Sequence, residues 1–223
     1  MGQAGRFGFN ETTPDKLQLD AGEFWANFDI EAFLADAQDE TTDVTDLSSY
    51  GLGDNPTATR LGATDGAGSF EANRDRNSID FDGKLGRTKG MERRGADGVN
   101  PQLVAPLMEF SEENMTMAVF GARVNELDDP GVTGVIEITG GEIRTTDYID
   151  NVVFIGKRSD GKPIIFEVRN CLSETFGFDP DHGSEGTVEI TFQAHFDVEE
   201  CTFDAFGGRE WVEPWRLVMY ADA

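Results

Sequence analysis

Short apolar runs separated by turn residues fill the middle of the chain, at residues 134–170. Gly140-Gly141 follows one alternating apolar run, and Asp160-Gly161 separates the apolar runs at residues 148–155 and 164–168. Strands joined through Gly-containing turns are typical of β-hairpins. The stretch therefore predicts two β-hairpins in series.

Two strands in this half of the chain differ in the burial that their patterns predict. Residues 149–155 are almost continuously apolar, so we expect both faces of that strand to be covered, one by a second sheet and the other by a neighbouring element or subunit. Residues 187–196 instead alternate, with Val188, Ile190, Phe192, Ala194 and Phe196 on one side. This alternation predicts a half-buried strand with one wet face.

The N-terminal part is less regular. Residues 1–16 predict a mobile leader. Residues 23–34 fit either a strand or a helix, and the alternation at their start favours a strand. Residues 35–66 are poor in apolar side chains and too long for an ordinary connector, so they predict an exposed loop or arm.

One short helix is expected, between Ser111 and Gly121. Ser111 suits an N-cap, Glu112 and Glu113 suit the positive end of the helix dipole, and Gly121 suits a stop. Pro106, in the apolar run before the helix, indicates a sheet edge or a bulge. A last strand is expected at residues 211–220.

Charge is the strongest compositional signal, because the 223 residues carry a net charge of −25. Such a chain does not bind nucleic acid through phosphates, since that binding depends on Lys and Arg. The acid excess need not have a specific function, because adaptation of the surface to a salty or high-GC host also produces it. The excess of Arg over Lys fits such a host. The absence of a long apolar run and of a secretory leader predicts no membrane span and synthesis in the cytoplasm.

The sequence has one basic patch, the segment 86–98, which predicts a Gly-punctuated hairpin or loop. It carries Arg87, Lys89, Arg93 and Arg94. Two interpretations stay open: a solvated surface loop, or the positive half of a contact with an acidic copy of the same protein.

Motifs for catalysis or cofactor binding are weak. The segment 156–162 has the spacing of a phosphate-binding loop, but Pro163 replaces the hydroxyl residue and leads into a strand, so a hairpin turn is favoured. The acidic turn at 179–183 lacks the acid that completes a calcium loop, and His182 and His195 have no nucleophile context. Cys171 and Cys201 are expected to stay reduced. We predict no catalytic residue, metal or cofactor.

Several segments in order resemble the major tail proteins of long-tailed bacteriophages. The resemblance rests on segments that together cover most of the chain from Leu17: residues 17–22, 61–70, 79–83, 101–110 with the Ser111 helix, 147–153 and 187–197. It implies a mainly β fold, namely a two-sheet β-sandwich or barrel-like tail-tube fold with one short flanking helix and long loops or arms. The domain would span residues 17–223, with the extended loop at 35–66.

The family also implies a structural role in the virion tail. Such subunits close into hexameric rings that stack into a hollow tail tube, through which DNA passes during viral genome ejection. The implied partners are further copies of the chain, a tape-measure protein and tail-end proteins, with DNA only as passing cargo and no membrane. A small-molecule-binding β-barrel or enzyme, and a virion decoration or baseplate protein, stay open as alternatives.

In a closed tube, the wet face of each strand lines the channel or faces outside. Glu189 lies among small polar side chains on its strand, and Glu137 and Glu167 alternate similarly on the central hairpins. We predict that at least one of these three carboxylates faces the channel, where DNA finds no cations to bind.

Overall fold

The structure is a computed structural model, and its described residues form a mainly β fold, as the sequence predicted. They are 22–37, 58–64, 68–78, 92–119, 121–126, 134–157, 162–179, 186–200, 202–203, 209–210 and 212–219. Within them lie one large antiparallel sheet, two small two-stranded sheets and two α-helices. The expected leader at residues 1–16 lies outside the described residues.

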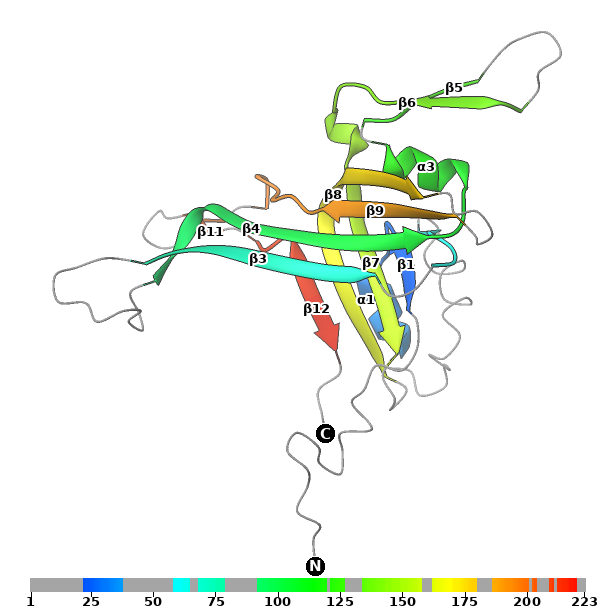
Figure 1. Cartoon of the computed structure of the whole chain (residues 1–223). Helices are drawn as coiled ribbons and strands as arrows, with labels where there is room; N and C mark the ends of the chain where they lie inside the picture. Colours follow the sequence, from blue (N-terminus) through cyan, green and yellow to red (C-terminus); the bar gives the residue numbers. More distant parts are fainter. Residues whose placement is uncertain are drawn as a thin grey trace, which may run out of the picture.

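The elements follow one another in this order (Figure 1): β1 (Glu23–Ala26), α1 (Ile30–Ala37), β2 (Thr59–Arg60), β3 (Ser69–Ser78), β4 (Glu92–Leu107), α3 (Glu112–Ala118), β5 (Arg123–Glu126), β6 (Ile136–Thr139), the 3-10 turn η2 (Thr145–Asp147), β7 (Ile149–Lys157), β8 (Pro163–Asp179), β9 (Thr187–Gln193), β10 (Thr202–Phe203), β11 (Arg209–Glu210) and β12 (Trp215–Met219). No helix in this described part is both long and apolar enough to cross a bilayer.

Strand β8 turns the large sheet into two layers. Its first half pairs with β7 and β12, and its second half pairs with β9, with a register shift between Ser173 and Thr175. We call β2, β1, β7, the first half of β8 and β12 the base layer. The second half of β8 with β9, β4 and β3 is the crossing layer. Figure 1 shows the strands of the two layers running crosswise, a packing in which bent or bulged strands form the corners.

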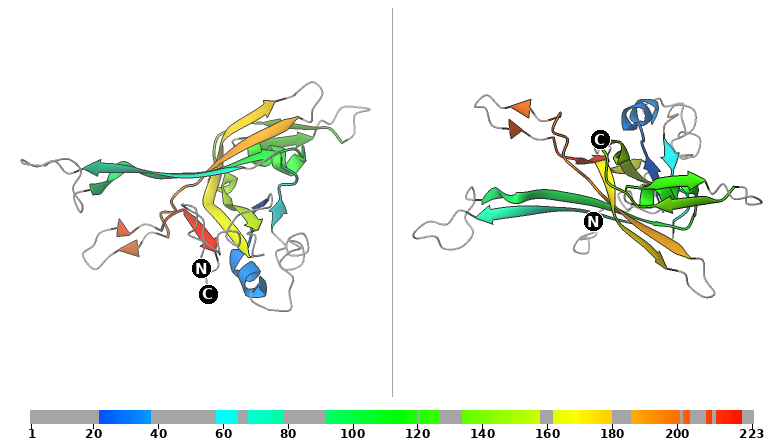
Figure 2. Two further views of the ribbon diagram at one scale, coloured as in Figure 1. Left: turned by 60° about the horizontal axis from the view of Figure 1, so that its bottom comes forward. Right: turned by 90° about the horizontal axis from the view of Figure 1, so that it is seen from above.

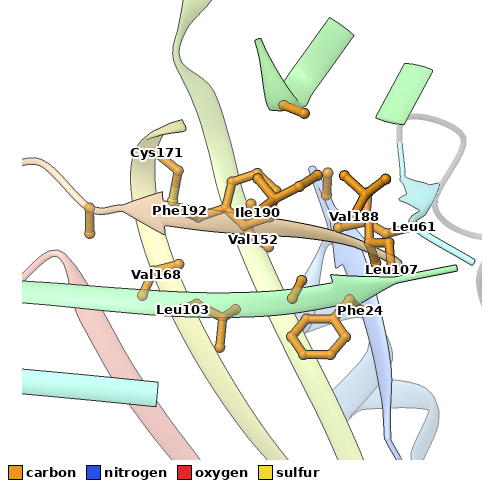
Figure 3. Close-up of a cluster of buried hydrophobic side chains, with 14 residues drawn as sticks. Phe24, Leu61, Leu103, Leu107, Val152, Val168, Cys171, Val188, Ile190 and Phe192 are labelled. Atoms are coloured by element: carbon orange, nitrogen blue, oxygen red, sulfur yellow. The ribbon is translucent and has the colours of Figure 1, made fainter. Parts of the chain in front are cut away.

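The main hydrophobic core lies between these layers (Figure 3). The alternation of β9 sends Val188, Ile190 and Phe192 into this core, which confirms the half-buried strand that the pattern predicted. Leu103 and Leu107 contribute from the neighbouring strand β4, and Phe24 contributes from β1 of the base layer. The two layers are therefore held together by apolar side chains at every second strand position.

Strand β7 is covered on both faces, as its continuous apolar run predicted. Val152 joins the main core, while Val153 and Ile155 join a second cluster with α1. The covering element is α1 itself, so the preference for a strand over residues 23–34 was only half right. Strand β1 ends where Asn27 takes a positive φ of 53°, and Asp29 then accepts a hydrogen bond from the Ala32 amide, as an N-cap does.

Two further expectations need correction. Gly140-Gly141 does not close a hairpin, because β6 pairs with the preceding strand β5 and not with the following strand β7. The extended loop at 35–66 is shorter than expected: α1 runs to Ala37, and β2 pairs with β1. Leu61 is also fully buried in the main core. Residues 38–57, the rest of the predicted loop, lie outside the described part.

The helix at Ser111 and the hairpin of β7 and β8 are confirmed. The Ser111 side chain accepts a hydrogen bond from the Asn114 amide, and Ala118 packs into the main core. Gly121 follows with a φ of +61°, and a Cβ there would lie 2.6 Å from the Gly141 carbonyl oxygen. Glycine at this position therefore allows both the turn and the close approach of the two backbones.

Candidate functional site

The outer face of the crossing layer gathers acidic and neutral polar side chains. In the strand register, Glu189 of β9 lies opposite Pro106 and Gly177, and Gln102 of β4 lies opposite Glu71 and Gln193. Directly opposed residues in an antiparallel pair point to the same face. Because the opposite face holds the main core, these side chains point outward. We call this surface the acidic face.

A hydrogen-bond network ties the acidic face together across three strands. The Gln102 side-chain amide lies 2.8 Å from both the Glu174 carboxylate and the Gln193 side-chain oxygen. Glu71, on β3, accepts a hydrogen bond from Asn73 at 3.1 Å. The side chains described on this face thus include Glu71, Glu174 and Glu189, all exposed, and neither Lys nor Arg. Its local field is therefore negative.

The three carboxylates predicted for the channel have different surroundings in the structure. Glu189 is exposed on the acidic face. Glu137 is exposed on β6, which belongs to the separate β5–β6 sheet. Glu167 requires a correction, because it is 2% exposed and lies inside the subunit. It offers no free carboxylate to a channel.

Glu167 is instead the centre of a buried ion cluster in the base layer. Its carboxylate accepts hydrogen bonds from Arg169, Arg216 and Asn151, with Asn151 at 2.9 Å. Arg216 also reaches Glu31 on α1 at 2.8 Å. Desolvation lowers the pKa of Arg216, but hydrogen bonds and charge interactions with Glu31 and Glu167 outweigh it and raise that pKa overall. The cluster joins β7, β8, β12 and α1.

Sequence reasoning missed Glu71 and Glu174 as members of the acidic face. Glu71 alternates with Phe70 and Ala72, a signal of one wet strand face, but nothing in the sequence shows which strands lie beside β3. Glu174 lies where the register of β8 shifts, so simple alternation assigns it to no face. Both depend on strand pairing between residues far apart in the chain.

Only part of the basic segment lies among the described residues. Arg93 and Arg94 belong to the start of β4, where they stand opposite Asn77 and Arg76 of β3. Arg87 and Lys89 fall outside the described residues. Whether this segment contacts an acidic copy stays a prediction.

The strands β3 and β4 form a ribbon that projects beyond the body of the molecule. Their ladder continues to the pair of Ser78 and Glu92, whereas β9 pairs with β4 only from Gln102 onward. Figure 2 shows this ribbon extending away from both layers, with the small β10–β11 hairpin lying apart from it. A two-stranded ribbon is only marginally stable by itself, and the outer half of this one has no third strand beside it among the described residues.

Pro101 shows which backbone groups of β3 face outward. Its carbonyl accepts a hydrogen bond from the Ala194 amide at 3.0 Å, so its backbone groups point toward the continuation of β9. Ala72 stands opposite Pro101 and must therefore direct its own N–H and C=O away from β4. The outer edge of β3 presents these groups without a strand partner among the described residues. Beyond Cys171, β8 pairs only with β9 among the described residues, so its second half forms the other open edge of the crossing layer.

A cavity of about 280 Å³ opens between α3, η2, β7 and β8. The carboxylate in its lining, Asp147, is held by the Arg123 guanidinium at 3.2 and 3.3 Å and by the Arg144 amide at 2.8 Å. Hydrogen bonds from Arg123, and then from Arg144, lower the pKa of Asp147. An ionised carboxylate that is bound in this way suits a structural role at η2 better than proton transfer.

The described residues of the motifs considered for chemistry show no catalytic arrangement. Strand β8 begins at Pro163, so a strand and not a helix follows the segment 156–162, of which residues 158–161 lie outside the described residues. His195 contacts the Asn170 carbonyl at 3.1 Å, and its ring forms a T-shaped contact with the Tyr148 ring. Cys171 is free and buried, and its burial raises the pKa of the thiol. Within the described ranges, no three His, Cys, Asp or Glu side chains gather as metal ligands.

Comparison with known proteins assigns no family to the chain. No protein-family model and no curated protein matches its sequence. The function must therefore be inferred from the open edges, the projecting ribbon and the acidic face.

Proposed function

We propose that this protein is the structural subunit of a bacteriophage tail tube, in which copies close into rings and the rings stack around a channel for DNA. The resemblance to major tail proteins implies six copies in each ring. The observation that carries the proposal is the crossing layer, which combines two open edges with one acidic face. The resemblance of the sequence to major tail proteins supports it. The virion tail is the corresponding location.

The strand order of the crossing layer suits closure into a ring. Its four strands, from β8 through β9 and β4 to β3, alternate in direction. A rotation about a ring axis places β8 of one copy beside β3 of the next, and an even number of alternating strands makes that joint antiparallel as well. Closure then removes both open edges, which are otherwise sites of aggregation.

The projecting ribbon supports contact between copies in a second direction. Its outer half receives no support from β9, and it carries Arg93 and Arg94 within a chain of net charge −25. A neighbouring acidic copy is a suitable partner for such a basic ribbon. In a stack of rings, this ribbon would reach the next layer.

The acidic face gives the channel a physical role. If this face turns inward, each ring repeats the carboxylates of Glu71, Glu174 and Glu189 around the channel. DNA phosphates find no cations there and pass without being held. A tape-measure protein inside the tube and tail-end proteins are the further partners that this role requires.

Electron microscopy of the purified protein tests the proposal. We expect rings or tubes in negative stain as protein concentration and salt are raised, because salt screens the repulsion between acidic copies. An enzyme or a small-molecule binder should instead stay small and carry its ligand, and a decoration protein should assemble only on capsids. A protein that remains monomeric at all concentrations and salts would contradict the tail-tube proposal.

Reversing the charge of the acidic face should make the tube retain DNA. In tubes carrying Glu71→Lys, Glu174→Lys and Glu189→Lys, we expect short duplex DNA to be held and protected from nuclease at about 0.05 M salt, and released as salt rises. Wild-type tubes should protect none. The measurement is the amount of labelled DNA that survives nuclease treatment.

A matched variant keeps the same net charge but moves the lysines to other exposed acids, Glu126, Glu199 and Glu200. These positions lie outside the acidic face, so any DNA bound there should remain open to nuclease. Equal protection by both variants would show that the acidic face does not line the channel.

A further inference from the structure

We propose that neighbouring copies are joined beneath the sheet by an aromatic seam, in which Phe176 and Phe178 of one copy pack against Phe70 of the next. The inference rests on the ring closure proposed above and names the side chains that hold it. The partner is a second copy of this chain.

The first half of the seam lies at the open edge of β8. Phe176 stands opposite Ile190, and Phe178 stands opposite Val188. Because both partners on β9 are fully buried, the two phenylalanines point to the core side of the crossing layer. They are nevertheless 45% and 53% exposed. At this edge, the core side of the crossing layer is therefore apolar but not fully covered by the rest of the subunit.

Phe110 extends this apolar surface from the end of β4. Its ring meets the ring of Phe178 edge to face, with centroids 5.2 Å apart, and it is itself 53% exposed. Helix α3 covers the adjoining core through Ala118 and Met115. Three large aromatic side chains thus stay half-uncovered beside a closed core, two of them on the β8 edge, which has no second strand partner there among the described residues.

The second half of the seam lies at the opposite open edge, on β3. Phe70 stands opposite the buried Leu103, so it also points to the core side of the crossing layer. It packs against Phe166 and Trp215 of the base layer, with ring centroids 5.3 and 5.5 Å apart. Both open edges therefore carry aromatic side chains on the same side of the sheet.

Joining the two edges brings these aromatic groups together. When β8 of one copy pairs with β3 of the next, the core side of the sheet is continuous across the joint, and the main cores of both copies meet under it. On the outer side, the same joint brings Glu174 near Glu71 of the other copy, and these two carboxylates repel each other. The attraction must then come from the apolar side, and salt should favour it by screening the carboxylates. A second copy fits this surface because it supplies both the missing strand and the missing aromatic cover.

The test removes the apolar character of the β8 edge. We expect the subunit of the double variant Phe176→Ser, Phe178→Ser to stay folded, with an unchanged circular dichroism spectrum. Its association constant, measured by sedimentation, should fall by at least about tenfold. The matched control is Val198→Ser with Val212→Ser, which also removes two exposed apolar side chains, 67% and 43% exposed, outside the seam. The control should associate like the wild type.

A second measurement identifies the partner surface directly. A photo-crosslinking phenylalanine analogue at position 178, in a mixture of isotopically light and heavy copies, should join residue 178 of one copy to the 69–78 segment of another. Wild-type-like assembly of the double serine variant, or crosslinks to any other surface, would overturn the seam while leaving ring formation intact. A wild-type protein that never associates would instead overturn the tail-tube proposal itself.

Discussion

Replacing Glu167 with alanine should lower the free energy of unfolding by about 3 kcal/mol, the usual cost of removing one partner from a buried ion pair. Without the carboxylate, Arg169 and Arg216 keep their positive charges with side chains only 27% and 32% exposed. Asn151 also loses a hydrogen-bond acceptor. Urea denaturation followed by circular dichroism measures the change.

Glu189→Ala is the matched control, because sequence alone gave the two glutamates the same interpretation. Glu189 is exposed and forms no ion pair among the described residues, so its replacement should change the stability by less than about 0.5 kcal/mol. Equal losses for the two variants would show that the buried cluster does not stabilise the base layer. A double variant, Glu167→Gln with Arg216→Gln, should recover part of the loss, since it removes charges of both signs.

Replacing Ala72 with proline should abolish ring and tube formation while leaving the monomer folded. The Ala72 amide points to the open edge of β3, so proline removes a donor that a strand of a neighbouring copy would need and that β4 does not use. We expect the stability of the monomer to change by no more than about 1 kcal/mol. Negative-stain microscopy reports assembly, and urea denaturation reports stability.

Glu71→Pro supplies the contrast at the next position. Its amide points toward β4, so proline there removes a ladder hydrogen bond inside the subunit and should destabilise the monomer clearly more than Ala72→Pro does. If Ala72→Pro forms tubes as the wild type does, the β3 edge takes no part in ring closure. If both proline variants unfold equally, the direction assigned to the Ala72 amide is wrong.

Local patterns of the sequence determined several elements correctly. The alternation of residues 187–196 is enough to place Val188, Ile190 and Phe192 in a core, because side chains of a strand point to opposite faces in turn. Ser111 specifies a helix start through a hydrogen bond to a residue three positions away. The hairpin of β7 and β8 needs only two apolar runs and a turn between them. Each of these signals acts over a few neighbouring residues.

The short range of these sequence signals also explains where the prediction was ambiguous. Residues 23–34 contain a strand and a helix, and the change between them depends on Asn27 at positive φ and on the fit of α1 against β7. Strand β6 follows an apolar pattern that fits either neighbour, and it pairs with β5. Packing against distant segments decides such cases, because local propensities differ by only about 1 kcal/mol per residue.

Sequence by itself thus determined the mainly β composition, the cap of α3, the alternation of β9 and the large negative charge. Only the tertiary structure decided which glutamate is buried: Glu137, Glu167 and Glu189 all alternate in strands, yet Glu167 alone of the three meets Arg169 and Arg216. It also decided that Glu71, Glu174 and Glu189 share one face. The physical reason is that an alternating pattern fixes two faces for each strand, whereas pairing between strands far apart in the chain decides which face is covered.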